Sequence, residues 1–216
     1  MVSSNNLFNR NNSIDDWIFV RLSKADEHEC EVRAKNAEII RENISAVKKT
    51  MKPDMLNSSI TCEDLFSTGF KGEVAFSYVY DLPKPSSKVA TDGLVDFWVG
   101  DISVQVKTIY GTQGNLIIDT PDNFCSDVCS LISEVKGENG DPLYIVQGWI
   151  TKKDFLEGHE KTFLKKPQKF KCVYNPRNLR TPESLWKYFK VNQNAQVTTR
   201  IVSSSSYTRS RNHGSA

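Results

Sequence analysis

The sequence predicts a mixed α/β domain, and three observations indicate this class. Apolar residues recur every three or four positions within residues 25–51, as they do on one face of a helix. Residues 94–111 are rich in β-branched and aromatic side chains around a central Gly100-Asp101, a pattern typical of a hairpin. The chain has 216 residues, of which 38% are apolar, and this is enough for one domain with a sizeable core.

Several classes of protein are excluded by the composition. No apolar run approaches the roughly 20 residues that cross a bilayer, and the N-terminus lacks the apolar segment of a secretory signal. The five cysteines are odd in number and scattered, which argues against a disulfide framework. We therefore expect a cytoplasmic or otherwise intracellular protein that is not secreted, keeps its thiols reduced and has no membrane partner.

Charge is distributed unevenly along the chain. Residues 1–150 carry 14 Lys and Arg against 22 Asp and Glu, whereas residues 151–216 carry 14 against 4. The overall charge of +2 therefore hides a basic C-terminal third joined to an acidic remainder. This asymmetry favours a polyanionic partner for the basic part and cation-binding carboxylates in the acidic part, although a solvated surface has a similar pattern.

The N-terminal half is expected to be helical after a flexible start. Residues 1–13 are rich in Asn and Ser and are predicted to be a flexible N-terminus. An amphipathic helix follows from about residue 25 to 51 and ends before Pro53. A second helix is predicted over residues 70–80, and the two prolines within residues 81–93 indicate a loop.

After the hairpin, the pattern predicts alternating strands and helices. Residues 115–119 (NLIID) are expected to form a third strand, and Thr120-Pro121 has the form of an N-cap that begins a helix ending at Gly137. Apolar positions on that helix would be Phe124, Val128, Leu131, Ile132 and Val135. The remaining elements expected are a buried strand at 142–150, a strand at 170–174, a helix begun by Thr181-Pro182-Glu183 and a flexible tail over 191–216.

The two faces of the hairpin have opposite character. If Gly100-Asp101 form the turn, Phe97 pairs with Val104 and Asp96 pairs with Gln105. Side chains alternate across a strand, so one face is entirely apolar and must be core. The other face carries Asp96, Trp98, Ser103, Gln105 and Lys107. A shift of one residue would bury a charge in place of a valine, so this contrast specifies the register.

These residues resemble the motif of the PD-(D/E)XK nuclease superfamily, whose members include restriction enzymes, homing endonucleases and Holliday-junction resolvases. The resemblance rests on Gly72-Glu73, Asp96 and Gln105-Val106-Lys107, with Gln105 where the second carboxylate usually stands. It covers residues 70–150 and implies a restriction-endonuclease-like αβββαβ core, in which a central mixed sheet is flanked by helices. The implied organisation is a single nuclease-like domain over 14–190, with its core at about 70–150 and a basic part at 151–190.

The resemblance also implies roles for these residues. Glu73, Asp96, Gln105 and Lys107 would form the catalytic set. Mg²⁺, with Mn²⁺ as a substitute, would be held by Asp96, the Gln105 side-chain oxygen, the Val106 carbonyl and Glu73. The reaction implied is metal-dependent hydrolysis of DNA phosphodiester bonds, and Lys107 would orient the attacking water or stabilise charge.

Contacts with DNA, most simply double-stranded, are expected from residues near the site and from the basic C-terminal part. Lysines interleaved with phenylalanines in residues 161–171 suit phosphate neutralisation, although a solvated loop would look similar. The candidate contacts are Tyr110, Gln113, Lys165, Lys166, Lys169, Lys171, Arg177 and Arg180. For Tyr110 and Gln113 an ordinary turn is the favoured interpretation, because Gly111 and Gly114 are typical turn residues. Cutting both strands with one active site per chain would require a homodimer.

Three other functions are compatible with the same residues. A non-catalytic nucleic-acid-binding protein could retain a nuclease-like fold, and the missing carboxylate at Gln105 makes this conceivable. A structural or interaction protein could use the charge asymmetry for assembly. An RNA-directed nuclease would differ only in its substrate.

Overall fold

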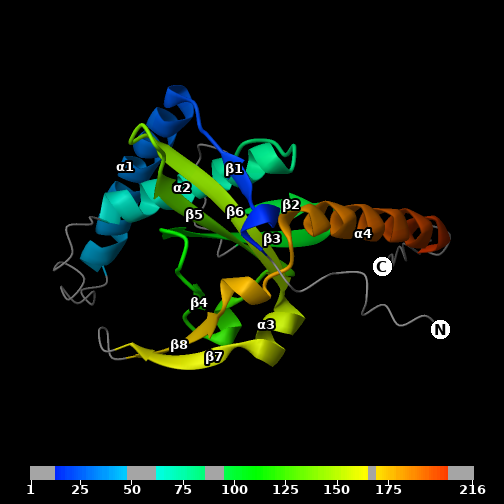
Figure 1. The fold of residues 1–216 in the computed structure, drawn as a ribbon. Coiled ribbons are helices and arrows are strands. Elements are labelled where there is room, and N and C mark those ends of the chain that lie inside the picture. Colours follow the sequence, from blue (N-terminus) through cyan, green and yellow to red (C-terminus); the bar gives the residue numbers. More distant parts are fainter. Residues whose placement is uncertain (1–12, 48–61, 86–94, 165–168, 204–216) are drawn as a thin grey trace, which may run out of the picture.

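The architecture is a curled, mixed five-stranded sheet flanked by helices, with a second, three-stranded sheet against one of its faces (Figure 1). This computed structural model describes residues 13–47, 62–85, 95–164 and 169–203. The strands of the large sheet, in spatial order, are β1 (Ile18–Val20), β6 (Pro142–Thr151), β5 (Val128–Lys136), β3 (Ile102–Tyr110) and β2 (Phe97–Val99). The small sheet has the order β4 (Leu116–Ile118), β8 (Lys169–Tyr174) and β7 (Glu160–Leu164).

Helices occupy the ends of the chain and the strand connections. The α-helices are α1 (Lys24–Val47), α2 (Cys62–Val79), α3 (Lys152–Gly158) and α4 (Pro182–Ser203). Short 3₁₀ turns are η2 (Ile14–Asp16), η4 (Pro121–Asn123) and η5 (Pro176–Asn178). Among the described residues, no helix is long and apolar enough to cross a membrane.

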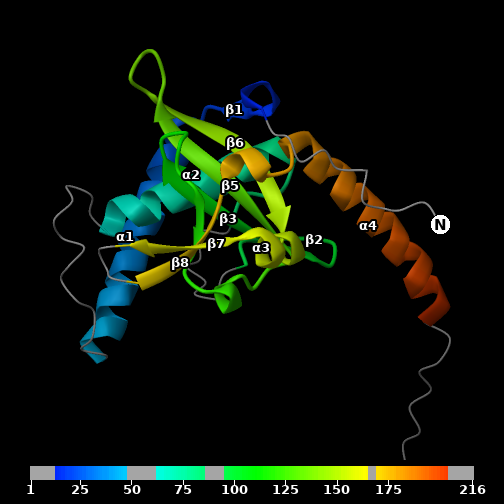
Figure 2. The same ribbon diagram turned by 60° about the horizontal axis from the view of Figure 1, so that its bottom comes forward.

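One face of the large sheet packs against α2 and the start of α4. The Phe76 ring of α2 lies 4.5 Å from the Tyr80 ring and 5.2 Å from the Phe97 ring, measured between centroids. Tyr80 also contacts Phe189 of α4, and its hydroxyl donates to the Pro182 carbonyl at 3.0 Å. These aromatic contacts hold α2 beside the hairpin. Figure 2 shows that the C-terminal part of α4 projects away from both sheets.

The opposite face of the large sheet is covered by the small sheet and α3. Leu131 and Ile150 of the large sheet are buried together with Leu116 of β4 and Phe155 of α3. The polar face of the hairpin lies on this side, because Gln105 pairs with Cys129 and Lys107 pairs with Leu131. On this face Gln105 is buried and Lys107 partly buried, whereas Trp98 near the hairpin turn is 67% exposed.

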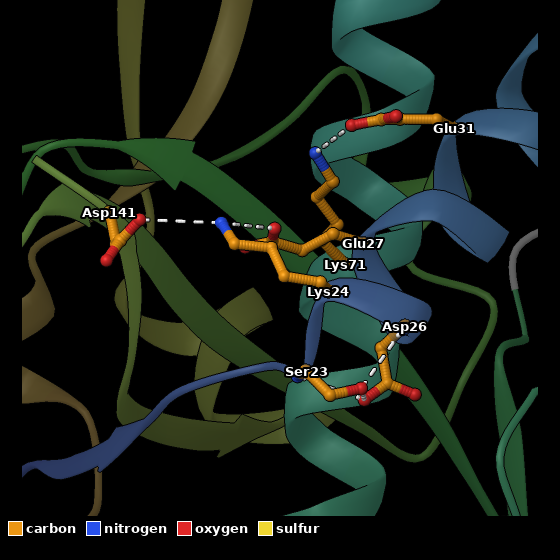
Figure 3. Close-up of polar contacts among 7 residues, drawn as sticks. All are labelled: Ser23, Lys24, Asp26, Glu27, Glu31, Lys71 and Asp141. Carbon is orange, nitrogen blue, oxygen red and sulfur yellow. Dashed lines mark hydrogen bonds and ion pairs between the residues drawn. The ribbon is translucent and has the colours of Figure 1, made fainter.

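Ion pairs join α1 to the rest of the domain (Figure 3). Lys71 of α2 contacts Glu31 of α1 at 3.4 Å, and Lys24 of α1 contacts Asp141 at 3.4 Å as well as Glu27 of its own helix at 3.1 Å. At least one partner in each pair is half-exposed or more, so these contacts orient α1 rather than contribute much stability.

Asp26 forms a more buried network at the start of α1. Its carboxylate accepts hydrogen bonds from the Ser23 hydroxyl at 2.6 Å, the Tyr78 hydroxyl at 2.7 Å and the Lys84 ammonium at 2.5 Å. Burial alone would raise the pKa of Asp26, but these donors outweigh it and hold the pKa well below its usual range. The network fixes α1 against α2 and against the segment that follows α2.

Most of the expected elements are confirmed. The helix predicted at 25–51 is α1, although residues 48–51 lie outside the described part, and the helix predicted at 70–80 is α2, which begins earlier at Cys62. Strands β4, β6 and β8 match the predicted strands, and a helix begins at Pro182. That helix extends to Ser203, into the segment expected to be a tail, while residues 1–12 and 86–93 lie outside the description.

The helix predicted between Thr120 and Gly137 is wrong. Thr120-Pro121 caps only a 3₁₀ turn, and the apolar residues that follow form β5, which pairs in parallel with β3. Residues 128–133 are all buried, so β5 contacts core on both of its faces and lacks the alternation that usually identifies a strand. The crossover from β3 to β5 therefore contains β4 and a 3₁₀ turn where the expected αβββαβ order has a helix.

Candidate active site

The hairpin brings Asp96 into direct contact with the strand that carries Gln105 and Val106. The observed pairs Phe97–Val104, Trp98–Ser103 and Val99–Ile102 confirm the predicted register, and Gly100 takes the positive φ of 65° that the tight turn requires. Asp96 continues the ladder through its amide, which donates to the Val104 carbonyl at 2.8 Å. Its carboxylate Oδ2 accepts from the Val106 amide at 2.6 Å, so the acid is fixed against the strand that carries Gln105.

Gln105 has an unusual environment for an amide side chain. The residue is 2% exposed, and its Oε1 has no hydrogen-bond partner among the described residues. A buried carbonyl oxygen without a donor is costly unless a water or a cation satisfies it. Asp96 stands opposite Gln105 in the backbone register of the hairpin, so the two residues offer the kinds of oxygen ligand that Mg²⁺ and Mn²⁺ prefer.

Glu73 reaches this site because α2 lies close to β3. A Cβ added at Gly72 would overlap the Thr108 hydroxyl of β3, so only glycine allows the helix to approach this strand. The side chain of Glu73 is 14% exposed, and its Oε2 accepts from Arg33 of α1 at 3.0 Å. Burial and the neighbouring Asp96 charge raise the pKa of Glu73 to about 7, against the lowering effects of Arg33 and Lys107.

Lys107 belongs to the same electrostatic cluster. It lies two residues beyond Gln105 on the same face of β3, is partly buried, and lowers the pKa of Glu73. The pKa of Cys129, which pairs with Gln105, is raised to about 12 by burial, with Lys107 opposing and Asp96 adding to the effect. Asp96 and Lys107 therefore act on the same buried thiol, which is itself unreactive at neutral pH.

Of the residues predicted to be catalytic, Asp96 is bound to the Val106 amide, and Asp96 and Lys107 both lie near enough to affect the pKa of Glu73. Arg33 was missed, because nothing in its sequence spacing links it to Glu73. Its position in the sequence did hold a clue, because Arg33 lies beside Cys30, Ala34 and Ala37 on the buried face of α1. A charged side chain next to a buried face needs a partner of opposite charge.

The predicted DNA contacts are more dispersed. Tyr110 ends β3, and its hydroxyl shares a hydrogen bond with the Thr68 hydroxyl at 2.5 Å while the residue stays 47% exposed. Arg180 is paired with Asp154, and its guanidinium lies 4.9 Å from the Trp149 ring centroid. Its charged group is therefore engaged in contacts within the domain. Gln113 and Arg177 line a common pocket.

The predicted lysines are described only in part. Lys169 and Lys171 lie on β8, where their backbones pair with Leu164 and Thr162, and their side chains are outside the description. Lys165 and Lys166 lie outside the described residues altogether.

Within the described part of the chain, no three His, Cys, Asp or Glu side chains form a metal-binding group. The candidate side-chain ligands are two carboxylates and one amide, and glutamine is a residue type outside that set. Comparison with protein-family models, curated proteins and solved structures finds no match for this chain.

Proposed function

We propose that the protein is a Mg²⁺-dependent DNA endonuclease of the PD-(D/E)XK type that hydrolyses phosphodiester bonds. The observation that carries the proposal is the buried, unsatisfied Gln105 Oε1 on the strand that binds the Asp96 carboxylate, with Lys107 on the same face. The proposed fold is a restriction-endonuclease-like core in which the connection between β3 and β5 contains β4 instead of a helix. Support for it comes from the order of α2, hairpin and parallel strand pair.

Each residue has a distinct proposed role. Asp96, the Gln105 oxygen, the Val106 carbonyl and Glu73 would hold the cation. When bound, Mg²⁺ or Mn²⁺ polarises a phosphate oxygen and lowers the pKa of a bound water. Lys107 is a compact positive charge that positions the water or stabilises charge on the phosphate. Glu73 must lose its proton to act as a ligand, and Arg33 favours its charged form.

Binding of the substrate is attributed to the basic C-terminal third. Its 14 Lys and Arg against 4 Asp and Glu would attract a polyanion, and most of this attraction would be independent of sequence. The acidic N-terminal part supplies the metal ligands, so the two functions are carried by different parts of the domain. A homodimer would place two such sites on the two strands of duplex DNA.

The test is cleavage of supercoiled plasmid with Mg²⁺ or with EDTA. Wild-type protein should nick the plasmid only with the metal, and Lys107→Met should reduce the rate by roughly 100- to 1,000-fold, as loss of one transition-state contact does. DNA affinity in EDTA should change little. Lys136→Met, at an exposed residue at the end of β5 and outside the basic third, is the matched control and should cut normally. Wild-type rates from Lys107→Met would show that the assignment is wrong.

A second candidate is a non-catalytic nucleic-acid-binding protein with a nuclease-like fold. It is favoured by the neutral Gln105 and by the ion pair between Glu73 and Arg33, which together reduce the negative charge available to a cation. This alternative predicts that DNA binds in EDTA and is never cut, with Mg²⁺ or with Mn²⁺. Asp96→Asn would then leave all measured properties except stability unchanged.

A further inference from the structure

A pocket of about 520 Å³ lies at the end of β3 that is farther from the hairpin turn. Three segments distant in sequence form its walls, namely residues 13–17, the turn at 112–115 after β3, and residues 175–177 at η5. Its volume falls in the range of small-molecule sites. Two of the DNA contacts predicted from sequence, Gln113 and Arg177, meet here although neither was chosen for proximity to the other.

The lining side chains combine three kinds of chemistry. Trp17 offers a flat aromatic surface, and Gln113 and Asn115 carry amides that both donate and accept hydrogen bonds. Arg177 is the charged residue of the lining and is exposed. An aromatic ring, amides and a guanidinium together match a nucleotide, whose base stacks, whose base edge pairs with amides and whose phosphate binds Arg.

Hydrogen bonds hold the walls in place. The Thr112 carbonyl accepts from the Gln147 amide at 2.9 Å, which fixes the turn after β3 to the buried part of β6. The Asn175 Oδ1 accepts from the Arg177 backbone amide at 2.9 Å. On the third wall, Asp16 accepts from the backbone amide and the hydroxyl of Ser13 at 2.9 and 3.0 Å. Little ordering of these backbones is therefore needed when a ligand binds.

The pocket also lies within reach of the candidate active site. Lys107 and Thr112 are five residues apart, so their Cα atoms are at most about 18 Å apart. One strand of DNA advances about 3.4 Å per nucleotide along the helix axis, so this distance corresponds to about five nucleotides at most. A strand positioned over Lys107 could therefore place one of its next few nucleotides in the pocket.

We infer that this pocket binds a single nucleotide, with its base on Trp17 and its phosphate on Arg177, from a DNA strand that extends across the candidate active site. The inference rests on the proposed function, since it takes the substrate to be DNA. It assigns to the pocket the capture of one unpaired nucleotide near the scissile phosphate.

Binding is measured in EDTA by fluorescence anisotropy with a labelled, short single-stranded oligodeoxynucleotide, between about 50 and 200 mM salt. Trp17→Ala should weaken binding by roughly 5- to 150-fold, the range for loss of one stacked base. Arg177→Gln should reduce the slope of log affinity against log salt by about 0.7, the value for one phosphate contact on a single strand. Thermal unfolding by circular dichroism verifies that the variants are folded.

Matched controls lie close to both positions. Phe19→Ala removes an aromatic ring that is 54% exposed on β1 and outside the pocket, and Arg21→Gln removes a nearby exposed guanidinium. Both should bind like wild type. Gln113→Ala, at an exposed residue, provides a pocket variant with little risk to folding.

Competition with free dAMP distinguishes the source of the nucleotide. If dAMP displaces the labelled oligonucleotide from wild type but not from Trp17→Ala, a free nucleotide is sufficient for binding to the pocket. If dAMP does not displace the oligonucleotide from wild type, the DNA strand is required. Pocket variants that bind the oligonucleotide like their controls would overturn the inference, even if the wild-type protein nicks plasmid. Weakened binding without any nicking would leave the pocket assigned and reject the proposed endonuclease activity.

Discussion

Substituting Gly72 with alanine tests whether the approach of α2 to β3 builds the candidate site. A Cβ at Gly72 would overlap the Thr108 hydroxyl and lie 3.0 Å from its Cβ and 3.1 Å from its Cγ2. Rotating the Thr108 side chain does not move the Thr108 Cβ, so it cannot remove the contact between that atom and the added Cβ. The helix or the strand must therefore move. Gly69 is the matched control, because a Cβ there meets no described atom within 4 Å.

The two substitutions share every effect except the clash. Alanine stabilises a helix by about 1 kcal/mol relative to glycine at either position. Overpacking a fitted contact costs about 1–3 kcal/mol. Gly69→Ala should therefore raise the free energy of unfolding by about 1 kcal/mol. The free energy of unfolding of Gly72→Ala should be about 2 kcal/mol lower than that of Gly69→Ala. For a chain of this length, that gap corresponds to a difference in Tm of about 4–8 °C.

Thermal unfolding of both variants, alone and with Thr108→Ala, measures the clash directly. Thr108→Ala removes the hydroxyl and the methyl group and should recover a large part of the Gly72→Ala loss, which a double-mutant cycle would report as coupling. Plasmid cleavage should fall in Gly72→Ala, since displacement of α2 carries Glu73 away from Asp96. Equal Tm values for Gly69→Ala and Gly72→Ala would refute the reasoning.

Two predictions concern pH. Because the pKa of Glu73 is raised to about 7, its neutral form stabilises the metal-free fold at low pH, and this stability is lost as pH rises from about 4.5 through 7. In EDTA, the wild-type free energy of unfolding should therefore fall by up to roughly 3 kcal/mol more than that of Glu73→Gln over this pH interval. The lowered pKa of Asp26 acts in the opposite sense, so Asp26→Asn should cost about 2 kcal/mol at pH 7 in urea unfolding. That difference should shrink as pH falls below about 4, and a constant difference would contradict the assignment.

The local pattern was sufficient to predict the hairpin and its register. An apolar face opposite a polar face leaves one register that keeps Asp96 and Lys107 out of the apolar core, and Gly100 marks the turn. The convergence of Asp96 with Gln105 follows from this alternation alone, without any knowledge of the rest of the fold.

The parts that could not be predicted depend on tertiary contacts. Strand β5 is buried on both faces, and its apolar residues have a spacing that also suits a helix, which periodicity alone cannot distinguish. The side of the sheet that carries Gln105 is covered by the small sheet, whose strands β4 and β8 are separated by about 50 residues of sequence. Arg33 reaches Glu73 only because α1 packs on α2.

The pairing of β4 with β8 has a consequence for the order in which a nascent chain can mature. Ile118 pairs with Cys172, and the chain reaches Tyr174 only roughly 3–11 s after Ile118 at ordinary rates of translation. Until β8 leaves the ribosome, Leu131 and Ile150 lack their cover and the Gln105 side of the sheet is open to water. The side of the sheet that carries the candidate site would thus close only after β8 has emerged, and a chain terminated before β8 would expose it to aggregation.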